Sequence, residues 1–160
     1  MSRSSVTVGD HGSARHSVSV ERVIASPAAR IFDLLADPAL HARLDGSGTV
    51  LGSHARNPRR LFPGATFTMD MRVRVPYRMW NSVVEFEENR RIAWRQELGH
   101  HVWRYELEPA TDSATMVRET FDWSTCRAKW LIHAMSWAER NQRSMTATLD
   151  RLAALVERSY

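Results

Sequence analysis

Residues 129–160 read KWLIHAMSWAERNQRSMTATLDRLAALVERSY, and this stretch decides the fold that the sequence predicts. Charged side chains occupy one side of a helix drawn over these residues, and neither Gly nor Pro interrupts the run. The pattern predicts one amphipathic helix about 45 Å long, at roughly 1.5 Å per residue. Because an isolated amphipathic helix is only marginally stable, we expect it to lie against a broad sheet. The side chains that recur at three- or four-residue steps on its other face are Trp130, Ala134, Trp137, Asn141, Met145, Leu149, Leu152 and Val156.

Two short helices are predicted near the beginning of the chain, directly after a first strand. That strand carries apolar residues at Val18, Val20 and Ile24. Ser26-Pro27 then places a hydroxyl at a helix cap and a proline in the first turn, which favours a helix start. Asp37-Pro38 repeats this device and opens a second short helix. The residues expected on the buried face of the first helix are Ile31, Leu34 and Leu35.

The middle of the chain carries strand patterns. From residue 66 to residue 75, apolar and polar side chains alternate with period two, which predicts a strand that Pro76 ends. Turn-forming sequences separate the other apolar segments. Further strands are expected at residues 49–53, 80–87, 92–97, 102–108 and 115–123. The predicted order is therefore one strand, two short helices, about six strands in a meander and the long helix.

Length and composition limit the classes of function. The chain has 160 residues, and we expect a flexible tail over residues 1–15 followed by a single domain over residues 16–160. Basic residues outnumber acidic ones by 22 to 18, a balance too diffuse to indicate nucleic-acid binding. Cys126 is the only cysteine, so no internal disulfide can form. The sequence shows no signal-peptide core and no apolar run of about 18 residues, so we expect a cytoplasmic protein without a transmembrane segment.

Seven short segments carry a resemblance to a known family. They are VERVIASP at 20–27, IFDLLADP at 31–38, DGSG at 45–48, PYRM at 76–79, NSVVEFE at 81–87, RIAW at 91–94 and TFDWS at 120–124. Together they resemble the helix-grip fold of the START-like superfamily, also called SRPBCC, and especially its polyketide cyclase/dehydrase-like branch. The resemblance covers about residues 16–158.

The resemblance implies an α+β fold in which a curved antiparallel sheet of about seven strands wraps around the long C-terminal helix. It also implies a pocket that the two short helices close. Proteins similar to this one bind lipids, sterols, polyketides or quinone-like molecules, and some cyclise or dehydrate polyketide chains. Because a fold hosts many activities, the resemblance favours binding of a small hydrophobic ligand in an internal cavity without assigning a reaction.

Aromatic and Met side chains on the predicted strands and helix either line such a cavity or fill a solid core. Pockets are mostly apolar with a few placed polar groups, and Met adapts to irregular ligands. The phase of each strand decides which side chains face inward, and a shift of one residue exchanges Trp80 and Val84 for Asn81 and Val83. The side chains expected to line the ligand cavity are Met69, Met71, Trp80, Val84, Phe86, Trp94, Tyr105, Phe121, Trp130, His133 and Trp137.

Three side chains are candidates for catalysis. Arg72 could pair a ligand carboxylate or stabilise an enolate, although the polar phase of its strand is typical of a solvated outer face. Asp45 could contact a ligand at the pocket mouth, or it could simply bond nearby amides. His133 could hold a ligand oxygen or act as acid or base, or it could be a bonded histidine at the helix boundary.

The sequence indicates no cofactor and no metal site. His100 and His101 are adjacent, so their side chains diverge, and no third ligand is suitably spaced for zinc. Three functions stay open: binding of a small apolar or amphipathic ligand, a polyketide cyclase or dehydratase that uses the same cavity, and a protein-interaction module with a filled core. A homodimer stays open as well.

Overall fold

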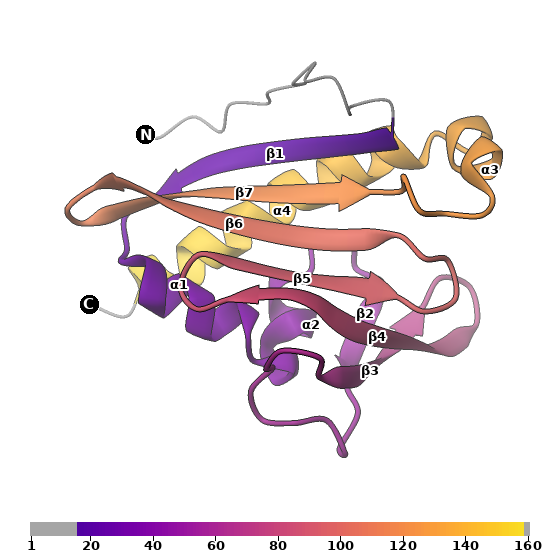
Figure 1. Ribbon diagram of the computed structural model, residues 1–160, viewed down its shortest axis with the longest axis horizontal. Helices are drawn as coiled ribbons and strands as arrows, with labels where there is room; N and C mark the ends of the chain where they lie inside the picture. Colours follow the sequence, from indigo (N-terminus) through magenta and orange to yellow (C-terminus); the bar gives the residue numbers. More distant parts are fainter. Residues whose placement is uncertain (1–15, 159–160) are drawn as a thin grey trace.

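Seven antiparallel strands form one sheet, and a long helix crosses one of its faces (Figure 1). The computed structural model describes residues 16–158, so the tail predicted over residues 1–15 lies outside the described residues. The elements in chain order are β1 (Ser17–Ile24), α1 (Ala28–Leu35), η2 (Pro38–Leu40), α2 (His41–Leu44), β2 (Val50–Ser53), β3 (Thr66–Arg72), β4 (Pro76–Glu87), β5 (Arg91–Gln96), β6 (Val102–Thr111), β7 (Ala114–Asp122), α3 (Lys129–Ala134) and α4 (Trp137–Glu157).

The strand order is β1-β7-β6-β5-β4-β3-β2, and all neighbouring strands are antiparallel. Strands β3 to β7 follow one another as a meander, whereas β1 and β2 lie at opposite edges of the sheet. The chain crosses from one edge to the other through α1, η2 and α2, and α1 and α2 also contact α4. This arrangement confirms the predicted α+β helix-grip fold with two short helices after the first strand.

One face of the sheet is apolar and packs against α4, which lies chiefly over β1 and β7. The strand register places Val20 of β1, Glu119 of β7, Tyr105 of β6 and Ile92 of β5 side by side, and all four are buried. We call this the inner face of the sheet. The side chains that α4 buries are Met145, Thr148, Leu149, Leu152, Ala153 and Val156.

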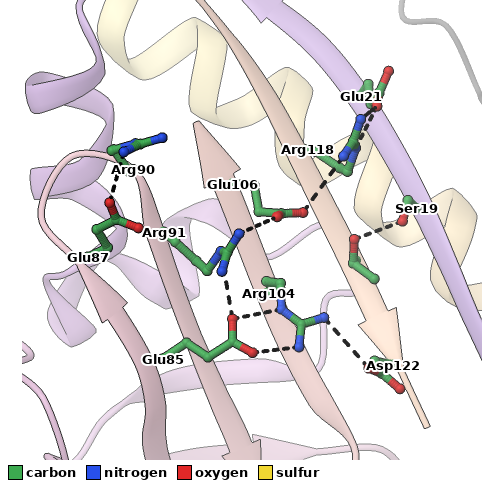
Figure 2. Close-up of polar contacts among 11 residues, drawn as sticks. Ser19, Glu21, Glu85, Glu87, Arg90, Arg91, Arg104, Glu106, Arg118 and Asp122 are labelled. Carbon is green, nitrogen blue, oxygen red and sulfur yellow. Dashed lines mark hydrogen bonds and ion pairs between the residues drawn. The ribbon is translucent and has the colours of Figure 1, made fainter. Parts of the chain in front are cut away.

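The opposite, outer face of the sheet carries a lattice of ion pairs (Figure 2). At its centre, Arg104 of β6 donates to Glu85 of β4 through Nε and Nη2, over 2.9 and 2.7 Å. Arg91 of β5 donates to Glu106 of β6 over 3.2 Å. Isolated exposed ion pairs contribute little to stability, but these half-buried pairs form a network with a bidentate pair at its centre, and they keep this face polar. Its members are Glu21, Arg118, Glu106, Arg91, Glu85, Arg104 and Asp122.

The C-terminal helix is interrupted, so the prediction of one unbroken helix is wrong. Ser136, between α3 and α4, has φ 52° and ψ 37°, in the left-handed region. That conformation costs a residue other than glycine roughly 1–2 kcal/mol, and the turn allows Ile132 of α3 to join the core. Figure 1 shows α3 turned away beyond the end of the sheet, and the 21 residues of α4 extend about 32 Å. The predicted apolar stripe is confirmed from Met145 to Val156.

Strand β3 is shorter than its alternating pattern predicts. It ends at Arg72, and Pro76 begins β4 instead of ending β3. A proline is tolerated as the first residue of a strand, where the missing N–H is least harmful. Val73 and Val75 lie in the connecting turn, and both side chains are exposed. The alternation therefore continues through turn residues that have no apolar face to cover them.

The two helix starts differ in how they are capped. Pro27 is the N-cap of α1, and the hydroxyl of Ser26 is buried without a hydrogen-bond partner among the described residues, so the predicted Ser26 cap is wrong. The carbonyl oxygen of Ser26 instead accepts a hydrogen bond from Thr115 Oγ1 over 2.8 Å, which ties α1 to β7. The Asp37 cap is confirmed, because its carboxylate accepts from the amide of Ala39 over 2.9 Å. The side chains that α1 buries are Ile31, Phe32 and Leu35.

Gly46 is the position where the turn after α2 approaches α4 most closely. A Cβ atom there would lie 2.2 Å from the carbonyl oxygen of Ser144 and 2.7 Å from the amide nitrogen of Thr148. The amide of Gly46 also donates to Thr148 Oγ1 over 2.9 Å, so the turn cannot move away without losing that bond. We predict that Gly46→Ala lowers the free energy of unfolding, measured by urea denaturation, by about 1–3 kcal/mol.

Gly52→Ala is the matched control, because a Cβ atom at Gly52 meets nothing within 4 Å. This change should alter the free energy of unfolding by no more than about 0.5 kcal/mol. Equal losses in the two variants would contradict the close packing of the turn on α4.

Candidate functional site

The inner face of the sheet carries a connected set of aromatic rings. The indole of Trp94 on β5 lies at the centre of this set. The distance between ring centroids is 4.9 Å from Trp94 to His41 of α2, 5.7 Å to Phe67 of β3 and 5.6 Å to Tyr105 of β6. His41 and Phe67 are buried, whereas Trp94 itself is only half-buried. An apolar surface is therefore present that the helices do not completely cover.

A second group of rings continues this surface along β6 and β7. Trp103 is the cross-strand partner of both Trp94 and Phe121, and its ring centroid lies 4.8 Å from that of Phe121. Phe121 is buried and also contacts His101 at 5.2 Å, whereas Trp103 stays half-buried. Burial lowers the pKa of His101 to about 4, so its imidazole is neutral at physiological pH. We call the combined surface the inner wall, consisting of His41, Phe67, Trp94, Trp103, Tyr105 and Phe121.

A polar pair interrupts the inner wall between β6 and β7. Tyr105 Oη donates to Glu119 Oε1 over 2.8 Å, between the adjacent strands β6 and β7. Glu119 is 2% exposed, and its Oε2 has no hydrogen-bond partner among the described residues. A buried polar group without a partner costs about 1–3 kcal/mol. Because such groups are rare in folded proteins, Glu119 is a candidate for contact with a ligand.

Burial sets the protonation state of these polar groups. Burial raises the pKa of Glu119 to about 8, the hydrogen bond from Tyr105 opposes this shift, and the carboxylate of Asp45 adds to it. Burial also raises the pKa of Tyr105 well above its usual value. Burial lowers the pKa of His41, whose Nε2 lies 2.8 Å from the carbonyl oxygen of Leu35. At neutral pH the site therefore holds a protonated carboxyl, a phenol and a neutral imidazole.

Asp45 organises the turn that follows α2. Its Oδ1 accepts from the amide of Ser47 over 3.1 Å, and its Oδ2 accepts from the amides of Thr49 and Val50 over 3.2 and 3.3 Å. The interpretation in which Asp45 bonds nearby amides is therefore confirmed. Its carboxylate also acts electrostatically on Glu119, so it contributes to the site from the edge.

Most of the predicted cavity residues lie on the inner side of the sheet or face it from α4. Trp130 does not: its side chain is 71% exposed, because α3 turns away from the sheet at Ser136. The prediction that Trp130 lines the interior is therefore wrong. Contact with a ligand stays a prediction for the predicted residues that do belong to the core or pack against it, namely Met69, Met71, Phe86, Trp94, Tyr105, Phe121 and Trp137.

Over residues 80–84 of strand β4, the side chains that face the interior are not the predicted ones but those one residue away from them. Trp80 and Val84 are 60% and 43% exposed, whereas Asn81 and Val83 are buried. The prediction that Trp80 and Val84 line the cavity is therefore wrong. A bulge between Val83 and Glu85 shifts the pairing with β5, so simple alternation does not hold along this strand.

The other catalytic candidates are not assembled into one site. Arg72 is the last residue of β3, and its side chain is exposed, in the phase opposite to the buried Phe67 and Met69. The interpretation of this phase as a solvated outer face is confirmed, so a catalytic site that combines Arg72 with an interior group is wrong. His133 belongs to α3, but its side chain lies outside the described residues, and its role stays a prediction.

Two hollows at the surface of the protein are open to solvent. One, of about 480 Å³, lies near the sheet edge formed by β2 and β3, and its lining includes Leu51 and Tyr77. The other, of about 440 Å³, lies between α2 and α4, and its lining includes Arg43 and Arg151. Neither is an enclosed cavity between the sheet and α4. Most side chains of the inner wall are buried or pack against the core, so a ligand placed between the sheet and α4 displaces some of them.

Four residues of the site are missing from the predicted cavity and catalytic residues, namely His41, Phe67, Trp103 and Glu119. Phe67 and Trp103 belong to the predicted strands, whereas Glu119 and His41 need separate explanations. Glu119 lies between Val117 and Phe121 in the same phase of β7. An ionisable residue in an apolar phase is a signal that the sequence alone contains. His41 gives no such signal. Its burial depends on stacking against Trp94, a contact between elements far apart in the chain that no local pattern records.

Three further properties of the described residues bear on the chemistry. Among the described side chains of residues 16–158, which do not include that of His133, no group of three His, Cys, Asp or Glu is placed to hold a metal ion. No helix over the same range combines the length and apolar character needed to cross a membrane. Cys126 is buried, and burial raises the pKa of its thiol, which disfavours the reactive thiolate form.

Sequence comparison relates the chain to one protein family. The sequence profile of a family described as polyketide cyclase / dehydrase and lipid transport matches residues 15–157. The uncharacterized protein Rv0088 of Mycobacterium tuberculosis is 38% identical over 153 residues, which are 92% of this chain and 66% of that protein. The chain therefore spans just under two thirds of the length of this relative.

Structure comparison extends the likeness to proteins of low sequence identity. Protein Ms6760 from Mycobacterium smegmatis superposes with a TM-score of 0.70 at 15% identity, covering 98% of this chain and 100% of its own. Protein NE0264 from Nitrosomonas europaea superposes with a TM-score of 0.70 at 19% identity, covering 92% of this chain and 99% of its own. The Polyketide_cyc-like protein Cgl2372 from Corynebacterium glutamicum superposes with a TM-score of 0.57 at 19% identity, covering 88% of this chain and 91% of its own. At these identities the likeness shows the fold alone.

The raised pKa of Glu119 predicts that stability depends on pH. Glu119 keeps its proton in the folded protein up to about pH 8, whereas in the unfolded chain it ionises near pH 4.5. Folding is therefore progressively disfavoured as the pH rises between these values, and the loss is complete above about pH 8. Glu119→Gln cannot ionise at this position. We predict that the melting temperature of Glu119→Gln minus that of wild type is at least about 4 °C larger at pH 8 than at pH 5.

Glu108→Gln removes an exposed carboxylate from β6 and controls for the change in net charge. If the difference in melting temperature between Glu119→Gln and wild type is the same at pH 5 and pH 8, the protonation state assigned to Glu119 is wrong.

Proposed function

This chain belongs to the polyketide cyclase / dehydrase and lipid transport family, and from that premise we propose that it binds a small, largely apolar molecule between the inner wall and helix α4. The family description supports a hydrophobic ligand, such as a lipid or a polyketide. The placement of the ligand is argued from the chemistry of the two sheet faces. The outer face presents charged side chains in ion pairs, whereas the inner wall presents aromatic rings.

The observation that carries this proposal is the partial exposure of Trp94 and Trp103. Both indoles belong to the inner wall, and both stay half-buried although their neighbours Tyr105 and Phe121 are buried. Covering apolar surface contributes roughly 25 cal/mol per Å², so an apolar molecule that covers these rings gains binding free energy. A wall of aromatic side chains with few polar groups is the usual lining of a small-molecule site.

Entry of a ligand requires movement of side chains, and the segment around α3 is where movement is easiest. The helix α3 packs chiefly against α4 and ends at the left-handed turn of Ser136. Trp137 opens α4 and is only half-buried against the core. Segments with few buried contacts open at lower free energy than the core of a sheet. We therefore place the entrance beside α3 and the first turn of α4.

An enzyme of the polyketide cyclase or dehydratase type is the second candidate. The observation that favours it is the buried Tyr105–Glu119 pair, because a protonated carboxyl can donate a proton to a bound substrate. Such an enzyme would use the same interior as the proposed binding site, and no role in it falls to the exposed Arg72.

A protein-interaction module is the third candidate. It is favoured by the filling of the interior with side chains and by several large apolar residues on the surface. The β3–β4 turn, the β5–β6 turn and α3 lie at the same end of the molecule in Figure 1. The exposed apolar side chains of these segments are Val73, Val75, Leu98, Trp130 and Met135.

Paired tryptophan substitutions distinguish binding at the inner wall from these alternatives. We predict that the wild-type protein binds 2-ethylnaphthalene saturably in equilibrium dialysis. Trp103→Leu should raise the dissociation constant about tenfold, because it removes an aromatic contact worth about 1.4 kcal/mol. Trp80→Leu removes an equal indole from the outer face and should leave the constant within about twofold.

Circular dichroism confirms that both variants are folded before their affinities are compared. Native mass spectrometry of the protein purified from its own host should also detect a bound small molecule. Absence of saturable binding to the wild type, or equal losses in the two tryptophan variants, would count against a ligand at the inner wall.

A further inference from the structure

We propose that Glu119, held by Tyr105, is the recognition point for the carbonyl oxygen of an uncharged apolar ligand, such as a ketone, an ester or a quinone. This inference rests on the proposed function, because a ligand must lie against the inner wall for its oxygen to reach Glu119. Tyr105 acts in this proposal as a positioning residue, and Glu119 makes the contact.

The carboxyl group of Glu119 is held with one oxygen available. Its Oε1 accepts the hydrogen bond of Tyr105 over 2.8 Å, and its Oε2 has no partner among the described side chains. The register places Glu119 between Val20 of β1 and Tyr105 of β6, and both neighbours are buried. The free oxygen therefore belongs to the inner face of the sheet, where water is largely excluded. A ligand between the sheet and α4 is in the right place to reach it.

The charged groups around Glu119 disfavour an ionised ligand. The carboxylate of Asp45, after α2, adds negative potential at the site. Arg22 of β1 forms an ion pair with Asp150 of α4. Arg151 of α4 donates to the carbonyl oxygen of Asp45. These two cations are therefore engaged elsewhere, and the Asp45 carboxylate opposes an anionic ligand at this position.

Neutral groups complete the surroundings of Glu119. His41 faces the site through Trp94, on which its ring is stacked, and Trp94 contacts the ring of Tyr105. Burial keeps the proton on the carboxyl of Glu119 at neutral pH. A protonated carboxyl donates a hydrogen bond, whereas a carboxylate can only accept. The available group is thus a donor in an apolar wall, and a carbonyl oxygen is the acceptor that an otherwise apolar molecule most simply offers.

Two probes that differ in one group test this inference. 2-Acetylnaphthalene carries a carbonyl where 2-ethylnaphthalene carries a methylene, and neither probe titrates. The measured quantity is the affinity for the acetyl probe divided by that for the ethyl probe, obtained by equilibrium dialysis at pH 6 and pH 9.5. At pH 6 this ratio should be about tenfold higher in the wild type than in Glu119→Met, which removes the hydrogen bond. In the wild type the ratio should fall at pH 9.5, because the ionised carboxyl no longer donates.

Glu119→Gln is the second variant, since its amide donates a hydrogen bond and does not titrate. Its ratio should be independent of pH. An unchanged ratio in Glu119→Met, or a pH dependence that persists in Glu119→Gln, would overturn the assignment of Glu119. If the ethyl probe binds but the ratio does not respond to Glu119, only this inference fails. If neither probe binds the wild type, the proposed function fails and this inference fails with it.

Discussion

The packing of α4 against the inner face of the sheet is the interaction on which the rest of the structure depends. Met145, Leu149 and Leu152 are almost completely buried there, so the helix fills the space that the sheet curves around. The same helix also fixes the crossing between the two sheet edges. Gly46 passes so close to the backbone of α4 that a side chain does not fit, and its amide bonds Thr148. One helix thus holds both the core and the connection from β1 to β2.

The two faces of the sheet differ in how they accommodate ionisable side chains. On the outer face, Arg104 of β6 pairs with Glu85 across β5 and with Asp122 of the adjacent β7, through charges that remain in contact with solvent. On the inner face, a charge would be buried, and the register leaves the Glu119 carboxyl with one hydrogen bond from Tyr105. The proposed binding of an apolar molecule is therefore assigned to the inner face, where Trp94 and Trp103 keep apolar surface that a ligand could cover.

Periodicity predicts the strands and the apolar stripe of α4 because both depend on local sequence. It fails where backbone geometry changes without a Gly or Pro signal, as at Ser136, and where a bulge reverses the phase, as between Val83 and Glu85. The candidate site is less predictable than the fold. Tyr105 follows from strand phase, but His41 is buried through stacking with Trp94, which depends on the folded topology.

Glu119 is the residue at which the sequence departs from the pattern that stabilises the fold. An ionisable residue in the apolar phase of β7 costs stability at neutral pH, because its carboxyl must be kept protonated, and within the described residues it gains only the bond from Tyr105. Departures of this kind are concentrated at functional sites, because they do not stabilise a packed core. Burial is at once what makes the carboxylate unfavourable and what keeps the carboxyl as an uncharged donor. The loss of stability and the proposed recognition of a carbonyl therefore have the same physical cause.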